Sequence, residues 1–162
     1  MKYDRIRKNP PQLLSLAGFD VTEFEAFLPT FKYRWEEYHS HFTLAGKMRE
    51  RITYNRKTSE IPLIEDKLLF ILSYLKNNPL QEYHGATYNM SQPQCNEWVH
   101  LLSDILCRTL KTLGKLPDRN HLRVKYLTGQ CEDILLDGTE RSIERPQDQD
   151  RQKSCYSGKK NS

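Results

Sequence analysis

The feature that most constrains the fold of this chain is a pair of apolar helical patterns in its central part. The first begins at Ile61-Pro62 and ends at Asn77-Asn78-Pro79, where proline prevents the helix from continuing. The second begins at a capping box predicted for Ser91 and Gln94, and its apolar residues recur at helical spacing up to Gly114. Both patterns are amphipathic, so each helix is expected to bury one face against other helices.

A short helix and a turn are predicted between these two patterns. The helix spans Leu80 to about Tyr88, and Asn89-Met90 forms the turn. A short helix, a tight turn and a longer capped helix are the arrangement of a helix-turn-helix, whose second helix enters the major groove of DNA. Residues 61–116 are therefore predicted to be a helix-turn-helix DNA-binding domain. Three-helix packing without any DNA contact gives the same pattern, and this alternative stays open.

The first turn and a half of the capped helix carries the side chains that would read DNA. They are Ser91, Gln92, Gln94 and Asn96. Gln and Asn can form two hydrogen bonds with adenine, and a helix N-terminus favours a phosphate. The same residue types are ordinary capping residues, and Glu97 and Asp104 on this helix would face a polyanion poorly. A helix that binds protein rather than DNA is therefore the alternative.

A basic linker is predicted over residues 47–60. Between 47 and 57 its cations are opposed only by Glu50, and they are Lys47, Arg49, Arg51, Arg56 and Lys57. The linker is either a solvated loop or an arm that contacts the phosphate backbone of DNA. The formal net charge of +4 permits DNA binding without requiring it.

An N-terminal helical segment is predicted over residues 1–46. Thr22 and Glu25 form a possible capping box, and Pro29 is expected to interrupt the helix that they begin. A second run, from Thr30 to about Phe42, carries aromatic residues at helical spacing. Such a stripe is more typical of core packing than of a ligand site.

The chain changes from helical to extended character after a polar connector at residues 117–130. The apolar triplet Ile134-Leu135-Leu136 runs into Asp137-Gly138, and a second β-type segment follows from Thr139 to Ile143. A carboxylate at the exit of a buried strand is a usual position for a metal-binding catalytic acid, because Mg²⁺ prefers oxygen ligands. An Asp-Gly pair after an apolar run is also typical of a β-turn, so both interpretations of Asp137 stay open.

The order of these features resembles the N-terminal half of bacterial insertion-sequence transposases of the DDE superfamily. The features are the basic linker, the leucine-rich helix that starts near Glu65, the helix-turn-helix, Asp137-Gly-Thr-Glu-Arg and Tyr156-Ser-Gly-Lys-Lys. The resemblance implies a mainly α helix-turn-helix domain, followed over residues 131–162 by the first β-hairpin of an incomplete ribonuclease H-like α/β domain.

The resemblance also assigns expected roles to individual residues. It implies that Asp137 is the family's first catalytic acid, which binds Mg²⁺ in a full-length enzyme, and that Gln92, Gln94 and Asn96 begin the DNA-reading helix. The second Asp and the Glu of the family's triad have no counterpart here. We therefore expect a truncated transposase that binds DNA without cleaving or joining it, and a fragment that holds no metal ion by itself.

The ending of the sequence has two explanations under this resemblance. Lys159-Lys160-Asn161 can be written in A-rich codons, which suits a ribosomal frameshift into a second reading frame, whereas a decayed or interrupted copy is the alternative. The expected partners are duplex DNA at the ends of the element, and the chain itself or full-length transposase. The rival functions are an interaction module that does not read DNA and a nuclease whose missing acids come from a second chain.

The sequence also indicates where such a protein would work. No stretch approaches the roughly 18 apolar residues of a membrane span. The charged N-terminus is not followed by the apolar core of a signal peptide, and the four cysteines form no C-x-x-C pair. A soluble protein of the bacterial cytoplasm, associated with the nucleoid, is therefore expected.

Overall fold

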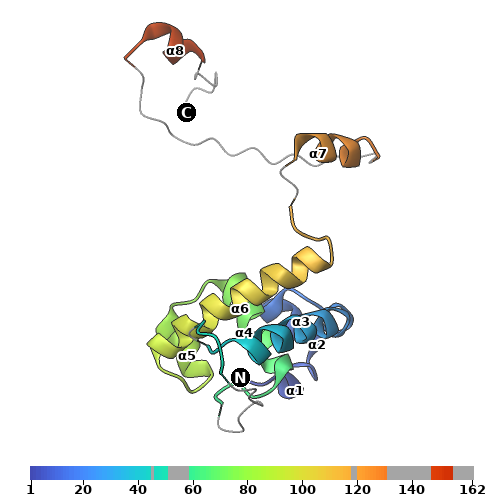
Figure 1. Cartoon of the computed structure of the whole chain (residues 1–162), viewed down its shortest axis with the longest axis vertical. Helices are drawn as coiled ribbons and strands as arrows, with labels where there is room; N and C mark the ends of the chain where they lie inside the picture. The colour runs from blue at the N-terminus through green and yellow to red at the C-terminus, as the bar shows by residue number, and fades with distance from the viewer. Residues whose placement is uncertain (45, 51–58, 118–119, 131–146, 155–162) are drawn as a thin grey trace. The chain divides into compact units, whose positions relative to one another are not determined.

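The computed structural model describes residues 1–44, 46–50, 59–117, 120–130 and 147–154 (Figure 1). The chain divides into two compact units, Met1–Pro117 and Asp118–Ser162. The helices of the first unit are α1 (Tyr3–Ile6), α2 (Pro10–Ala17), α3 (Val21–His41), α4 (Ile64–Asn77), α5 (Gln81–Thr87) and α6 (Gln92–Thr112). The second unit contains α7 (His121–Thr128) and α8 (Gln149–Ser154). The first unit is helical, as predicted, and no strand occurs in the described part of the chain.

Helix α4 forms the centre of the first unit (Figure 1). Its residues from Leu68 to Ile71 are fully buried, so this helix is surrounded by others rather than lying on the surface. It contacts α1, α2, α3 and α6, and α6 packs in addition against α3 and α5. The N-terminal helical segment and the predicted helix-turn-helix therefore share one hydrophobic core.

Helix α3 differs from the two helices predicted for this part of the sequence. It is continuous from Val21 to His41 and contains Pro29, so the prediction that this proline interrupts the helix was wrong. Four aromatic side chains are buried on one face before and after the proline, and they are Phe24, Phe27, Phe31 and Trp35. Burial of each contributes about 1.5–3 kcal/mol, which together exceeds the cost of about 3 kcal/mol for an internal proline.

The start of α3 also differs from the predicted one. Asp20 is the N-cap, and its Oδ1 accepts a hydrogen bond of 2.8 Å from the Glu23 N–H. The Glu23 Oε2 accepts one of 3.0 Å from the Asp20 N–H, which completes a capping box. The predicted box of Thr22 and Glu25 was wrong because both residues lie inside the helix. Aspartate is a better N-cap than threonine, which favours the earlier start.

The ends of the helices around the predicted turn agree with the sequence. Helix α4 stops at Asn77, and Asn78 follows in the left-handed conformation with φ 44°. The turn between α5 and α6 contains Asn89, with φ 59°. The capping box of Ser91 and Gln94 at the start of α6 is confirmed. The predicted short helix, turn and long helix therefore all exist.

The second unit contains a helix that the sequence patterns did not indicate. Helix α7 lies inside the predicted polar connector at 117–130, and its N-cap Asn120 accepts a 3.0 Å hydrogen bond from the Leu122 N–H. Its apolar residues are exposed, with Leu122 at 66% and Tyr126 at 65%. The segment with the predicted β-hairpin and Asp137 lies outside the described residues.

Candidate nucleic-acid interface

The turn between α5 and α6 is built around Gly85. Its carbonyl oxygen accepts hydrogen bonds of 3.0 Å from both the Tyr88 N–H and the Met90 N–H. A Cβ atom placed on Gly85 would lie 2.8 Å from the Met90 carbonyl oxygen and 3.3 Å from the Cys95 Cβ. The close approach of α5 to the start of α6 therefore requires glycine here. Sequence reasoning missed this residue, although a glycine inside a short helix before a turn is a known sign of close packing.

A buried histidine supports the turn from behind. His84 lies 4% exposed, and its Nε2 is 3.1 Å from the Phe70 carbonyl oxygen on α4. Its ring packs against Phe70, Tyr74 and Tyr88, with centroid distances of 4.4 to 5.3 Å. Burial lowers the pKa of His84, so the neutral imidazole is the favoured form. This histidine fixes α5 on α4 and does not face a ligand.

At the start of α6, Gln94 is engaged in the helix cap. Its Oε1 accepts hydrogen bonds of 2.9 Å from both the Ser91 N–H and the Ser91 hydroxyl. Its Nε2 donates to the Glu60 Oε1 at 3.1 Å. Of the four predicted DNA-reading residues, Ser91 and Gln94 therefore form the cap. The bond to Glu60 places the end of the predicted basic linker beside this cap.

The other two predicted reading residues, Gln92 and Asn96, are connected through a residue of α5. The Gln92 Nε2 donates to the Gln81 Oε1 at 2.7 Å, and the Gln81 Nε2 donates to the Asn96 Oδ1 at 3.0 Å. Gln92 is exposed, whereas Gln81 and Asn96 are half-buried. We call these three side chains the amide relay. Sequence reasoning did not find Gln81, which is the first residue of α5 as Gln92 is the first residue of α6.

The amide relay leaves hydrogen-bonding groups of Gln92 available. A glutamine amide has two N–H donors and an acceptor oxygen, and one donor of Gln92 is used by Gln81. The second donor and Oε1 have no partner within the described part of the chain. These are the two groups with which glutamine recognises the N7 and N6 of adenine.

The helix-turn-helix itself carries no lysine or arginine between Lys76 and Arg108, whereas Glu82, Glu97 and Asp104 lie in this stretch. Asp104 forms a 2.9 Å ion pair with Arg108, about one turn along α6. Lysine or arginine side chains that attract an anion to this stretch must therefore come from neighbouring segments.

One of these neighbouring segments is the predicted basic linker. Arg49 is half-buried, and its Nε donates to the Phe42 carbonyl oxygen at 2.7 Å. The backbone N–H of Arg49 donates to the His41 carbonyl oxygen at 2.8 Å, so Arg49 is held against the C-terminal end of α3. Arg51, Arg56 and Lys57 lie outside the described residues.

The two residues that follow this linker, Ile61 and Pro62, are held by a buried lysine. Lys67 on α4 is 1% exposed, and its Nζ donates to the carbonyl oxygens of Ile61 and Pro62, the latter at 3.1 Å. The ammonium lies 4.9 Å from the Trp35 ring centre and 5.7 Å from that of Trp98. Burial lowers the pKa of Lys67 to about 8. Ile61 and Pro62, predicted to begin α4, precede it because their carbonyls are bound to this side chain.

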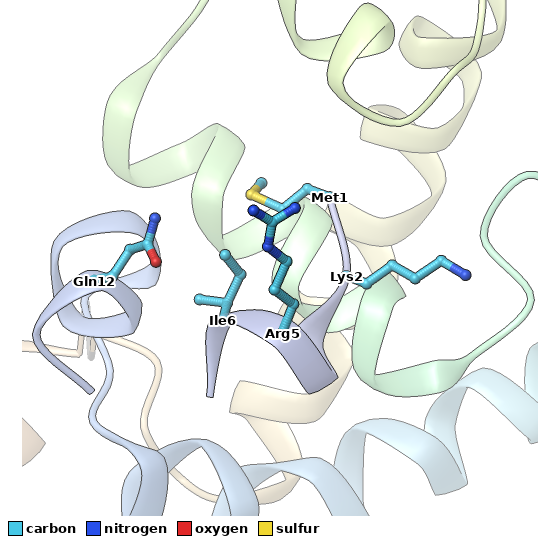
Figure 2. A pocket seen from close by; sticks show the side chains of 5 residues that line it. All are labelled: Met1, Lys2, Arg5, Ile6 and Gln12. Carbon is cyan, nitrogen blue, oxygen red and sulfur yellow. The ribbon is translucent and has the colours of Figure 1, made fainter. Parts of the chain in front are cut away.

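A pocket lies at the N-terminal helix of the same unit (Figure 2). It has a volume of about 400 Å³ and is lined by Met1, Lys2, Arg5, Ile6 and Gln12. Figure 2 shows the Arg5 guanidinium beside the Met1 side chain, whereas Lys2 extends in another direction. The pocket lining therefore combines the cationic side chains of Lys2 and Arg5 with the apolar side chain of Ile6.

The described residues offer no metal centre. They hold no group of three or more His, Cys, Asp or Glu side chains that could bind a metal ion. Asp137, the predicted Mg²⁺ ligand, lies outside them, so its role stays a prediction. Among the helices of the described residues, none is both long and apolar enough to cross a membrane.

Comparison with known proteins identifies the central segment. Residues 63–112 match the family model described as helix-turn-helix of DDE superfamily endonuclease. This helix-turn-helix comprises α4, α5 and α6, and the match confirms that a helix-turn-helix lies in this region, whereas the domain bounds 61–116 stay a prediction. The match covers less than a third of the chain and does not extend to α1, α2, α3 or the C-terminal unit. No curated protein and no solved structure matches the chain.

Proposed function

We propose that this chain binds duplex DNA through its helix-turn-helix and serves as the DNA-binding part of a DDE-type transposase. The observation that carries the proposal is the tight Gly85 turn within a segment that matches the helix-turn-helix of DDE superfamily endonucleases. The turn presents the first turn of α6, whose side chains at Gln92 and Gln94 are exposed. In such domains the N-terminal residues of the second helix contact base edges.

In this proposal Gln92 reads an adenine in the major groove. Its amide offers one acceptor and one donor to the base while Gln81 holds the second N–H. Gln81 acts as a positioning residue, because its bonds to Gln92 and Asn96 reduce the rotamer freedom that binding would otherwise remove. A correctly paired base is favoured over a wrong one by about 1–3 kcal/mol per bidentate contact.

Cations outside the helix-turn-helix would contact the phosphates. Arg49, Arg51, Arg56 and Lys57 belong to the linker that ends at the α6 cap, where Glu60 accepts from Gln94. Phosphate contacts supply most of the sequence-independent affinity of DNA-binding proteins. The natural target in this proposal is the terminal DNA of a bacterial insertion sequence, as the resemblance of the sequence to insertion-sequence transposases suggests.

The experiment is selection of bound duplexes from a randomised pool, followed by fluorescence anisotropy with the selected duplex. We expect binding that weakens steeply with salt and a defined base preference at one or more positions. Gln92→Ala should abolish the preference for adenine at one position and weaken binding to the selected duplex by about 1–3 kcal/mol. The control is Gln130→Ala, an exposed glutamine of the second unit, which should leave both properties unchanged.

A second candidate function is protein association through the exposed side of α5. Leu80 is 79% exposed and Tyr83 70% exposed, and acidic Glu82 lies between them. Such a surface suits a protein partner, either this chain or a full-length transposase, and its charge does not suit a polyanion. Light scattering of the purified chain would detect self-association. If assembly persists in a variant with alanine at Gln92, Gln94 and Asn96, and no duplex is selected, this function replaces DNA binding.

A further inference from the structure

The N-terminal segment that forms the pocket is held against the helix-turn-helix by two hydrogen bonds. The amino group of Met1 donates to the Thr87 carbonyl oxygen at the last residue of α5. The Tyr3 N–H donates to the buried Asp66 Oδ1 in the first turn of α4 at 2.7 Å. Thr87 is followed after the turn by Ser91, the N-cap of α6. The backbone that carries Lys2 and Arg5 is therefore anchored to the end of α5 and to the start of α4.

These cations lack acidic partners in the part of the chain that the structure describes. Lys2 and Arg5 are both exposed, and neither forms an ion pair there. No acidic side chain lines the pocket, and the nearby Asp66 carboxylate is 3% exposed and bound to the Tyr3 N–H. The Gln12 amide provides a further polar group at the pocket.

Charged groups also surround the Met1 amino group. Its pKa is lowered mainly by burial; the Asp66 carboxylate opposes this shift, and the positive charges of Lys2 and Arg5 add to it. Lys2 and Arg5 therefore lie close enough to the pocket for their charges to act there.

The turn and most of α6 need cations that this stretch does not contain. The stretch from Asn77 to Cys107 has acidic residues and no lysine or arginine, whereas a DNA-binding protein must neutralise backbone phosphates. Helix α1 lies outside the segment that matches the helix-turn-helix family, so its cations are a feature of this chain's own N-terminal part.

We propose that Arg5 and Lys2 form a phosphate-binding site for the DNA backbone beside the helix-turn-helix. Arg5 binds a phosphate in the pocket with Gln12, and Lys2, which extends in another direction, contacts the backbone next to it. This inference rests on the proposed DNA binding and adds a sequence-independent contact to it. It predicts that the two cations affect affinity and salt dependence without affecting base preference.

The first test measures affinity for the selected duplex between 0.1 and 1 M salt. Each of Lys2→Gln and Arg5→Gln should reduce the slope of log K against log salt by about 0.9, which lowers affinity roughly eightfold at 0.1 M if the curves meet at 1 M. Lys8→Gln is the matched control, because Lys8 is an exposed cation of the same segment that does not line the pocket. Its slope should equal that of the unmodified chain.

The second test locates the contacted phosphates by replacing them one at a time with neutral methylphosphonates. The unmodified chain should lose affinity at particular positions, Arg5→Gln should be insensitive at one of them, and Lys8→Gln should keep the full pattern. The inference is overturned if Arg5→Gln and Lys2→Gln keep the slope and pattern of the unmodified chain, or if Lys8→Gln loses as much as they do. If the unmodified chain binds no duplex at all, DNA binding itself has failed.

Discussion

Replacing Gly85 with alanine sets two opposing effects against each other. In an ordinary helix interior this change stabilises the protein by about 0.5–1 kcal/mol, because alanine is the better helix former. At Gly85 the new Cβ would lie 2.8 Å from the Met90 carbonyl oxygen, a backbone atom that cannot move without moving the turn. Overpacking of this kind costs about 1–3 kcal/mol. We therefore expect a net loss of roughly 1–2 kcal/mol of unfolding free energy.

Thermal and urea unfolding followed by circular dichroism would measure this loss. For a domain near 100 residues a change of 1 kcal/mol shifts Tm by roughly 4 °C, so a decrease of about 4–8 °C is expected. Ala86→Gly is the matched control, because Ala86 is the exposed neighbour in α5 and its replacement reports helix propensity alone. An unchanged or raised Tm for Gly85→Ala would show that the turn has room for a side chain, and would refute the close-approach argument.

Three further predictions concern other parts of the first unit. Asp20→Ala should cost about 1 kcal/mol in urea unfolding, whereas Thr22→Ala should change stability by less than about 0.5 kcal/mol; equal effects would contradict the observed cap. The pKa of Lys67, about 8, is below its usual 10.5, so the unfolded chain holds this proton more tightly than the folded one. The measured quantity is the unfolding free energy of the unmodified chain minus that of Lys67→Met. This difference should stay level below pH 8 and rise by up to roughly 3 kcal/mol between pH 8 and 10.5. A difference that stays level or falls between pH 8 and 10.5 would contradict the buried ammonium. Gln81→Met should relax base discrimination at the same position as Gln92→Ala, and the double variant should discriminate little less than either single variant. If the two losses of discrimination measured by anisotropy add up in the double variant, Gln81 does not act through Gln92.

The helix boundaries near the turn could be predicted because their signals are local. Asn78 before Pro79 ends α4, and Ser91 with Gln94 begins α6, since capping and proline sterics act within a few residues. The apolar spacing of α6 also predicts which face is buried, whereas α4, predicted to bury one face, is buried on all sides from Asp66 to Ser73. These signals were enough to place a helix-turn-helix, which the family match over 63–112 confirms.

The features that escaped prediction depend on contacts between distant segments. Pro29 is tolerated because the aromatic residues on both sides of it are buried against other helices, and sequence spacing alone does not reveal that burial. The role of Gly85 depends on how closely α6 approaches α5. Helix α7 has exposed apolar residues and no stripe that would have indicated it.

The candidate site was likewise predicted in part: its residue types could be predicted from the sequence, but the contacts between them could not. The sequence identified Ser91, Gln92, Gln94 and Asn96 by residue type, but it could not distinguish their partners. Gln94 is engaged by Ser91 and Glu60, whereas Gln92 and Asn96 are joined through Gln81. Their contacts with DNA stay a prediction, as do those of Arg49, Arg51, Arg56 and Lys57 and the metal-binding role of Asp137.

The most direct test of DNA reading by α6 is anisotropy with the selected duplex in which the adenine assigned to Gln92 is replaced by 7-deazaadenine. This change removes one major-groove acceptor, N7, and leaves base pairing intact. The unmodified chain should bind the altered duplex about tenfold more weakly, and Gln92→Ala should bind both duplexes equally. Equal binding of the two duplexes by the unmodified chain, at every adenine of the selected site, would contradict major-groove reading by the first turn of α6.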